Sequence, residues 1–131
     1  MAKVTGELYN ILGRGQNQKV LSVKLSFTYD EPQWQNDEVQ SVEFLLSVQA
    51  GDKTAELKAQ TNFATAEVSV VAVLTDPLTL CLLKCAGKAL LGPLIECFNK
   101  DIGKYLECLR SKGLSIAIDV VACSAECVAD A

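Results

Sequence analysis

The chain has 131 residues, half of them apolar, and a formal net charge of −4. This length fits one domain or two very small ones. The sequence contains no histidine, so it lacks the commonest general base and metal ligand. The modest negative charge argues against nucleic acid as a partner.

Period-two alternation in the first half of the chain predicts β-strands. The clearest segments are residues 21–29, 42–48, 55–59 and 64–72, with a weaker one at 7–12. Gly51-Asp52 suits a hairpin turn, and Thr61-Asn62 suits another tight turn. We therefore predict an antiparallel meander of four to five strands with one apolar face that needs a cover.

The hydrophobic period changes at Thr75-Asp76-Pro77, where a capping side chain precedes proline at a first helical position. We predict one helix over about 77–91, ending at Gly92-Pro93, and a last helix over about 114–128, beginning after Gly113. One or two short helices lie between them. The expected fold is α+β, with a sheet half at 1–76 and a bundle of three to four short helices at 77–131. Leu74 to Leu78 contains no linker, so we expect the two halves to share one core.

All six cysteines lie in the predicted helical half, and an even number at such spacing indicates a disulfide framework. The nearly palindromic spacing favours nested pairing: Cys81–Cys127, Cys85–Cys123 and Cys97–Cys108. In one unbroken helix Cys97 and Cys108 would lie about 16 Å apart, beyond the roughly 7 Å that a disulfide spans. Their pairing therefore requires the chain to fold back, most easily at Asp101-Ile102-Gly103, which gives four helices.

Other states of the cysteines stay open. Three helices would instead favour the crossed pairs Cys81–Cys123 and Cys85–Cys127. Thiolates at these four positions could hold zinc, and free buried thiols would fit a cytosolic protein. We favour nested disulfides and four helices, because the two predictions agree with each other.

Residues 78–128 resemble the saposin-like proteins. The resemblance is carried by nested six-cysteine pairing, by the central Cys97-x10-Cys108 and by lysine-dotted amphipathic helices. The sequence departs from that family in its two C-x3-C pairs, its shorter spans and its strand-rich first half. The resemblance implies a disulfide-stapled helical bundle that contacts lipid.

Apolar side chains crowd residues 78–98 beyond the single stripe of a surface helix. They either pack within the bundle and on the sheet, or in part face lipid or another protein. The lysines among them can reach lipid headgroups, or they form an ordinary solvated face. The predicted membrane or partner contacts are Leu82, Leu83, Lys84, Lys88, Leu90, Leu91 and Ile95.

No catalytic motif is visible, and we expect neither enzymatic activity nor a cofactor or metal. The cysteines favour a secreted, extracellular protein, although this chain shows no signal peptide and no apolar run of transmembrane length. The leading hypothesis is a membrane-active or lipid-binding protein, such as an antimicrobial or defensive effector, with the helical half as the active part. The alternative is a non-enzymatic protein interaction or structural module that uses the sheet edge or the helical face. Either would be compatible with a homo-oligomer.

Overall fold

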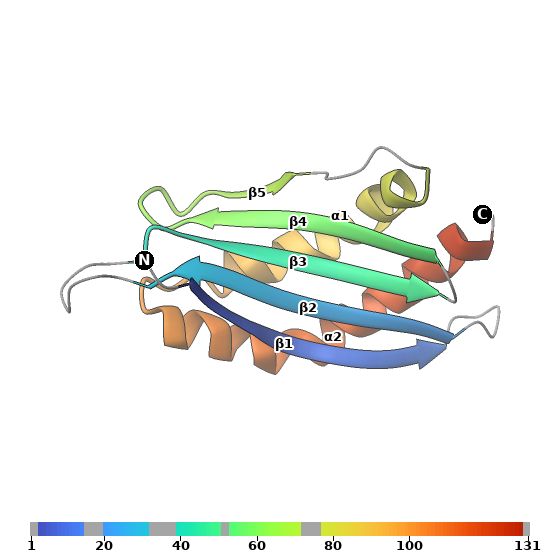
Figure 1. Ribbon diagram of the computed structural model, residues 1–131, viewed down its shortest axis with the longest axis horizontal. Coiled ribbons are helices and arrows are strands. Elements are labelled where there is room, and N and C mark those ends of the chain that lie inside the picture. Colours follow the sequence, from blue (N-terminus) through green and yellow to red (C-terminus); the bar gives the residue numbers. More distant parts are fainter. Residues whose placement is uncertain (1–2, 15–19, 32–38, 51–52, 72–76, 130–131) are drawn as a thin grey trace.

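The computed structural model describes residues 3–14, 20–31, 39–50, 53–71 and 77–129. In these segments a five-stranded antiparallel sheet is followed by two helices, which cover one face of the sheet (Figure 1). The α+β class and the order of sheet before helices are confirmed. The predicted boundary at residues 76 and 77 adjoins residues 72–76, which lie outside the described residues.

The strands are hydrogen-bonded to one another in chain order, so the predicted meander is confirmed. They are β1 (Lys3–Arg14), β2 (Val20–Asp30), β3 (Ser41–Ala50), β4 (Lys53–Asn62) and β5 (Val68–Val71). The predicted turn at Gly51-Asp52 lies outside the described residues, although Ala50 and Lys53 on either side of it pair with each other.

Alternation along the strands gives the sheet one buried face. Leu25, Leu46 and Leu57 lie directly opposite one another on β2, β3 and β4, and none of them is accessible to solvent. The neighbouring pair Lys24 and Ser47 points to the opposite face, where Lys24 is exposed and Ser47 half-buried. The helices cover the apolar face, which removes its side chains from water.

β1 is longer than the weak strand predicted at 7–12, and a β-bulge explains the difference. The register with β2 shifts between Glu7 and Tyr9. The extra residue lets the consecutive side chains Leu8 and Tyr9 share the helical side, with Leu8 buried and Tyr9 half-buried. Because two neighbours face the same way, the period-two pattern is broken in the middle of the strand.

The predicted turn at Thr61-Asn62 is wrong, because both residues complete β4. The chain turns over residues 63–65 instead, where the Asn62 Oδ1 accepts hydrogen bonds from the Ala64 and Thr65 backbone N–H groups at 2.9 and 3.3 Å. Asparagine side chains commonly direct such turns two residues onward. β5 begins only at Val68, four residues after the predicted start.

Two long helices replace the predicted three to four short ones. α1 spans Pro77–Glu96 and α2 spans Ile102–Ala129. The start at Pro77 and the chain reversal near residue 101 are confirmed. Asp101 caps α2, since its Oδ1 accepts hydrogen bonds from the N–H groups of Gly103 and Lys104 at 3.0 and 3.3 Å.

α1 continues through Gly92-Pro93, where we expected it to end. A proline disfavours helical backbone in the preceding residue partly through a clash with that residue's Cβ, which Gly92 lacks. Leu90 and Leu94, on either side of the proline, are fully buried. Their burial favours the helix and offsets the hydrogen bond that proline cannot donate.

α2 likewise continues through Gly113, where the sequence predicts a helix boundary. A Cβ built on Gly113 would lie 2.6 Å from Cδ1 of Tyr9 on β1. The glycine therefore permits close approach between α2 and the sheet. Gly13 on β1 plays the reciprocal role, because a Cβ there would lie 2.8 Å from Cγ2 of Val121.

Two of the helical glycines, Gly92 and Gly113, should respond to replacement by alanine with opposite changes in stability. Gly113→Ala is expected to lower the free energy of unfolding by about 1–2 kcal/mol, because the Tyr9 ring must move. Gly92→Ala is expected to raise it by about 0.5 kcal/mol, since no atom lies within 4 Å of that Cβ position and alanine favours helix. Urea unfolding of both variants tests this, and stabilisation by Gly113→Ala would contradict the close approach.

The buried apolar side chains of the sheet and of both helices belong to a single hydrophobic cluster. α1 packs on β4 and β5, whereas α2 packs on β1 and β2. Aromatic rings join the layers: Tyr105 of α2 packs against Phe44 of β3, and against Phe63 and Phe98, at centroid distances of 5.7–5.8 Å. The two halves therefore bury their apolar surfaces against each other.

Disulfides join the two antiparallel helices. Cys81–Cys127 and Cys97–Cys108 have Cα–Cα distances of 5.8 and 5.6 Å, and both confirm the nested pairing. Cys123 is also disulfide-bonded. The side chain of Cys85, its predicted partner, lies outside the described residues, so that pair stays a prediction. Nested pairing thus needs only one helical hairpin.

Candidate functional site

α1 presents a mixed apolar and basic face to solvent. Leu80 and Ile95 are 43% and 59% exposed, Lys84 and Lys88 are exposed, and Leu91 is half-buried. Their spacing of four, four, three and four residues places them on one side of the helix. We call these five residues, Leu80, Lys84, Lys88, Leu91 and Ile95, the α1 surface.

The structure separates the residues predicted to contact a membrane or partner. Lys84, Lys88, Leu91 and Ile95 lie together on the α1 surface. The placement of Leu90 on a contact surface is wrong, because its side chain is fully buried in the core. The backbones of Leu82 and Leu83 are helical, but their side chains lie outside the described residues.

The charge distribution distinguishes the α1 surface from the sheet. Three ion pairs occur among the described residues: Lys24–Glu7, Lys58–Glu43 and Lys112–Glu96. The first two lie on the solvent face of the sheet. Neither Lys84 nor Lys88 takes part in an ion pair with the described part of the chain. Within the described residues, no acidic side chain neutralises their charge.

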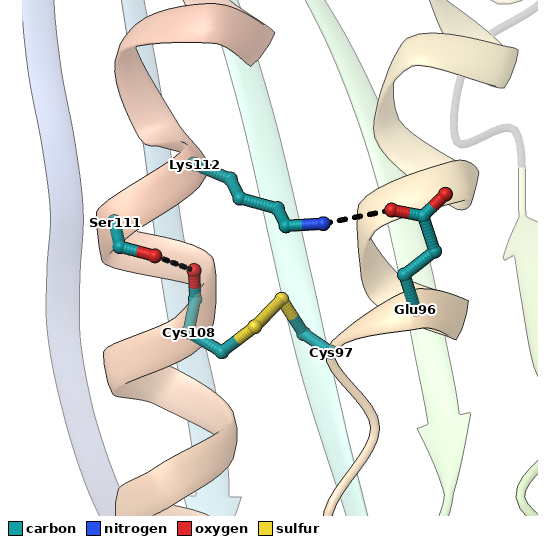
Figure 2. A network of polar contacts seen from close by, with 5 residues as sticks. All are labelled: Glu96, Cys97, Cys108, Ser111 and Lys112. Carbon is teal, nitrogen blue, oxygen red and sulfur yellow. Dashed lines mark hydrogen bonds and ion pairs between the residues drawn. A yellow bond between two sulfur atoms is a disulfide. The ribbon is translucent and has the colours of Figure 1, made fainter.

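The carboxyl end of α1 is fixed to α2 by a disulfide with an ion pair beside it (Figure 2). The Lys112 Nζ lies 2.7 Å from the Glu96 Oε2, next to the Cys97–Cys108 bridge. The hydrogen bond from Lys112, followed by its charge, lowers the pKa of Glu96. Because both groups are largely exposed, the pair contributes little to stability, and the disulfide is what holds this end of the hairpin.

Tyr105 belongs to the core, and the half-buried Tyr9 packs against it. Tyr105 is fully buried and donates a hydrogen bond to the Leu94 carbonyl at 2.8 Å, while its oxygen lies 2.8 Å from the Thr61 Oγ1. Burial raises the pKa of both Tyr105 and Tyr9 above the ordinary value.

A second exposed apolar pair was missed by the sequence analysis. Leu114 and Ile118 of α2 are 64% and 60% exposed. We expected the last helix to begin at residue 114. The sequence therefore offered no preceding helical turn that would show which face of the helix Leu114 and Ile118 occupy. Their four-residue spacing, out of phase with the buried Leu109, Ile116 and Val120, is the signal that identifies them once α2 is taken as one helix.

The described residues contain no group of histidine, cysteine or acidic side chains placed to hold a metal ion. Within the same residues, neither helix combines the length and the apolar character needed to cross a bilayer. The two disulfides are consistent with an extracellular protein.

Comparison with known proteins found no matching family model, no matching curated protein and no matching solved structure. The resemblance of residues 78–128 to saposin-like proteins therefore stays a prediction.

Proposed function

We propose that this protein is secreted and binds lipid surfaces peripherally through the α1 surface. One observation carries the proposal: Lys84 and Lys88, which have no ion-pair partner in the described chain, lie on the same helical face as the exposed side chains of Leu80 and Ile95. An apolar stripe with basic residues beside it is typical of helices that lie in a membrane interface. An antimicrobial or defensive role would be one use of such binding.

The expected affinity is modest. Inserting the exposed parts of Leu80 and Ile95 would contribute about 1–2 kcal/mol each. Lys84 and Lys88 would each add about 1 kcal/mol near an anionic surface. These contributions must exceed the cost of association, so we expect reversible binding that depends on both the apolar and the basic residues.

The distribution of charge and the disulfides support binding with the helical side toward the lipid surface. Residues 1–76 hold six basic and ten acidic residues, whereas residues 77–131 hold six of each. The sheet half is thus the more acidic part, and an anionic surface would attract the helical side in preference. The disulfides hold α1 in place before binding, so little conformational entropy is lost on contact.

A matched pair of variants tests the proposal. Ile95→Glu removes an apolar contact from the α1 surface, and Ile118→Glu makes the same change at a nearly equally exposed position on α2. Co-sedimentation with phosphatidylcholine–phosphatidylserine vesicles should weaken about 30-fold or more for Ile95→Glu, since about 2–3 kcal/mol is lost. Ile118→Glu should bind nearly as well as the parent.

The lysines are tested in the same assay. Lys84→Gln combined with Lys88→Gln should weaken binding about tenfold or more and reduce its dependence on salt. Lys24→Gln, on the solvent face of the sheet, is the control. Circular dichroism and a thiol assay must first show that each variant is folded and oxidised. If the folded parent binds neither anionic nor neutral vesicles, the proposal is wrong.

Interaction with another protein chain is the second candidate function. The observation that favours it lies on the opposite side of the molecule from α1: β1 is a long edge strand, and exposed apolar side chains of α2 lie beneath it.

A further inference from the structure

Among the described residues, β1 leaves a long side of the sheet without a partner strand. It is the first strand in the order β1-β2-β3-β4-β5, it is 12 residues long, and no described strand pairs with its outer side (Figure 1). The opposite edge strand, β5, has only four residues. A long edge presents rows of backbone N–H and C=O groups that can pair with another strand, whereas a short one is self-limiting.

An apolar flank continues this edge into the helical layer. α2 runs beneath β1, since Gly113 approaches Tyr9 and Val121 approaches Gly13. Between these two contacts lie Leu114 and Ile118, the most exposed large apolar residues of the described helices.

Leu114 and Ile118 face away from α1. Lys112 of α2 reaches across to Glu96 of α1. Leu114 is two residues further along the helix, which corresponds to a rotation of about 200° around its axis. The side chain of Leu114 therefore lies on the side of α2 opposite α1, and Ile118 follows it one turn later. We call β1 with Leu114 and Ile118 the edge surface.

The edge surface is complementary to itself. In antiparallel pairing with a second copy, opposite residues must face the same side of the sheet. A two-fold axis between Leu8 and Tyr9 meets this condition along all of β1, because the bulges of the two copies then coincide and Glu7 lies opposite Asn10. Like charges, Lys3 and Arg14, meet only at the exposed ends, where solvent screens them.

The size of the edge surface suits a stable dimer. Twelve residues of strand extend over ~40 Å, and the sheet and helical layers together are ~20 Å deep. Each copy therefore offers an area of at most about 800 Å², which is what a standard protein interface takes from each partner. A two-fold arrangement buries the same patch on both copies, so a second copy needs no other binding surface.

We propose that two copies of this chain associate through their edge surfaces. The two β1 strands pair antiparallel, so that two five-stranded sheets become one continuous sheet, and Leu114 and Ile118 of each copy pack against the α2 helix of the other. The α1 surfaces remain free at the two ends of the dimer. The assignment therefore does not depend on whether the α1 surface binds lipid.

Sedimentation equilibrium over a wide range of protein concentration tests the dimer with the same two variants used for lipid binding. Ile118→Glu should raise the dimer dissociation constant about tenfold or more, because it places a charge in the apolar flank. Ile95→Glu, changed at a nearly equally exposed position on α1, should leave it unchanged. Hydrogen exchange should show amides of β1 that become protected as the protein concentration rises, while β5 does not respond.

A parent protein that stays monomeric at all accessible concentrations would overturn this assignment. So would a dimer that Ile95→Glu disrupts and Ile118→Glu leaves intact, since that pattern would place the interface on α1. Leu114→Glu gives an independent check if Ile118→Glu fails to fold. A parent protein that forms the dimer but binds neither anionic nor neutral vesicles would refute the lipid proposal alone.

Discussion

Complete reduction of the disulfides is expected to lower the free energy of unfolding by roughly 7 kcal/mol, the largest single effect that we predict. The two described bridges join residues separated by 46 and 11 positions. In the chain-entropy account, the longer loop contributes about 4 kcal/mol and the shorter about 3 kcal/mol by restricting the unfolded chain. Because a small domain is stable by only about 5–15 kcal/mol, reduction should bring this protein close to unfolding.

Urea unfolding with and without a reductant, followed by circular dichroism, measures this effect. The double variant Cys97→Ala with Cys108→Ala is the internal control, since it removes only the shorter loop and should cost about 3 kcal/mol. An unchanged unfolding midpoint after verified reduction would show that packing of the helices on the sheet suffices without the bridges.

Replacement of Tyr105 by alanine is expected to destabilise the protein more than any other single substitution that we propose. Tyr105 is fully buried at the meeting point of β3, β4 and both helices. Tyr105→Ala should cost about 3–5 kcal/mol, because the ring leaves a cavity. Tyr105→Phe should cost about 1–3 kcal/mol, because the Leu94 carbonyl loses its donor and the Thr61 hydroxyl loses its acceptor in the core.

The difference between the two Tyr105 variants separates the packing of the ring from the hydrogen bonds of the hydroxyl. Thr61→Val supplies the control, since valine has nearly the same shape and removes only one polar group. The free energy of unfolding from urea titration is the measurement. A Tyr105→Phe variant as stable as the parent would show that these two hydrogen bonds contribute nothing net.

The pH dependence of stability gives a second test of Tyr105. Burial raises the pKa of its hydroxyl to about 12, and the hydrogen bond with Thr61 acts in the opposite direction. In the unfolded chain a tyrosine has a pKa of about 10. The contribution of the protonated Tyr105 hydroxyl to the free energy of unfolding is fully present below pH 10. It is lost as the pH rises toward 12, because only the unfolded state then releases the proton. The deficit of Tyr105→Phe relative to the parent should therefore shrink over that interval.

Local patterns in the sequence determined much of this fold. Alternation such as Leu21 to Tyr29 identified the strands of the meander, because a sheet with one buried face requires period two. The Asp76-Pro77 pair located the start of α1, and the distance that a disulfide can span located the chain reversal after Cys97. Each of these signals depends on a few neighbouring residues or on a fixed bond length.

The tertiary structure decided what the glycines and leucines do. A glycine can interrupt a helix, permit close packing or precede a proline, and the glycine itself does not reveal which role it has. Only the position of Tyr9 shows that Gly113 permits close packing of α2 against β1. Likewise, Leu90 is buried while Ile95, five residues later, is 59% exposed. In a chain with apolar residues around most of a helix, local hydrophobicity does not distinguish the core from the surface. The sheet and α2 select which face of α1 is covered, because burial depends on contacts between segments that are distant in sequence.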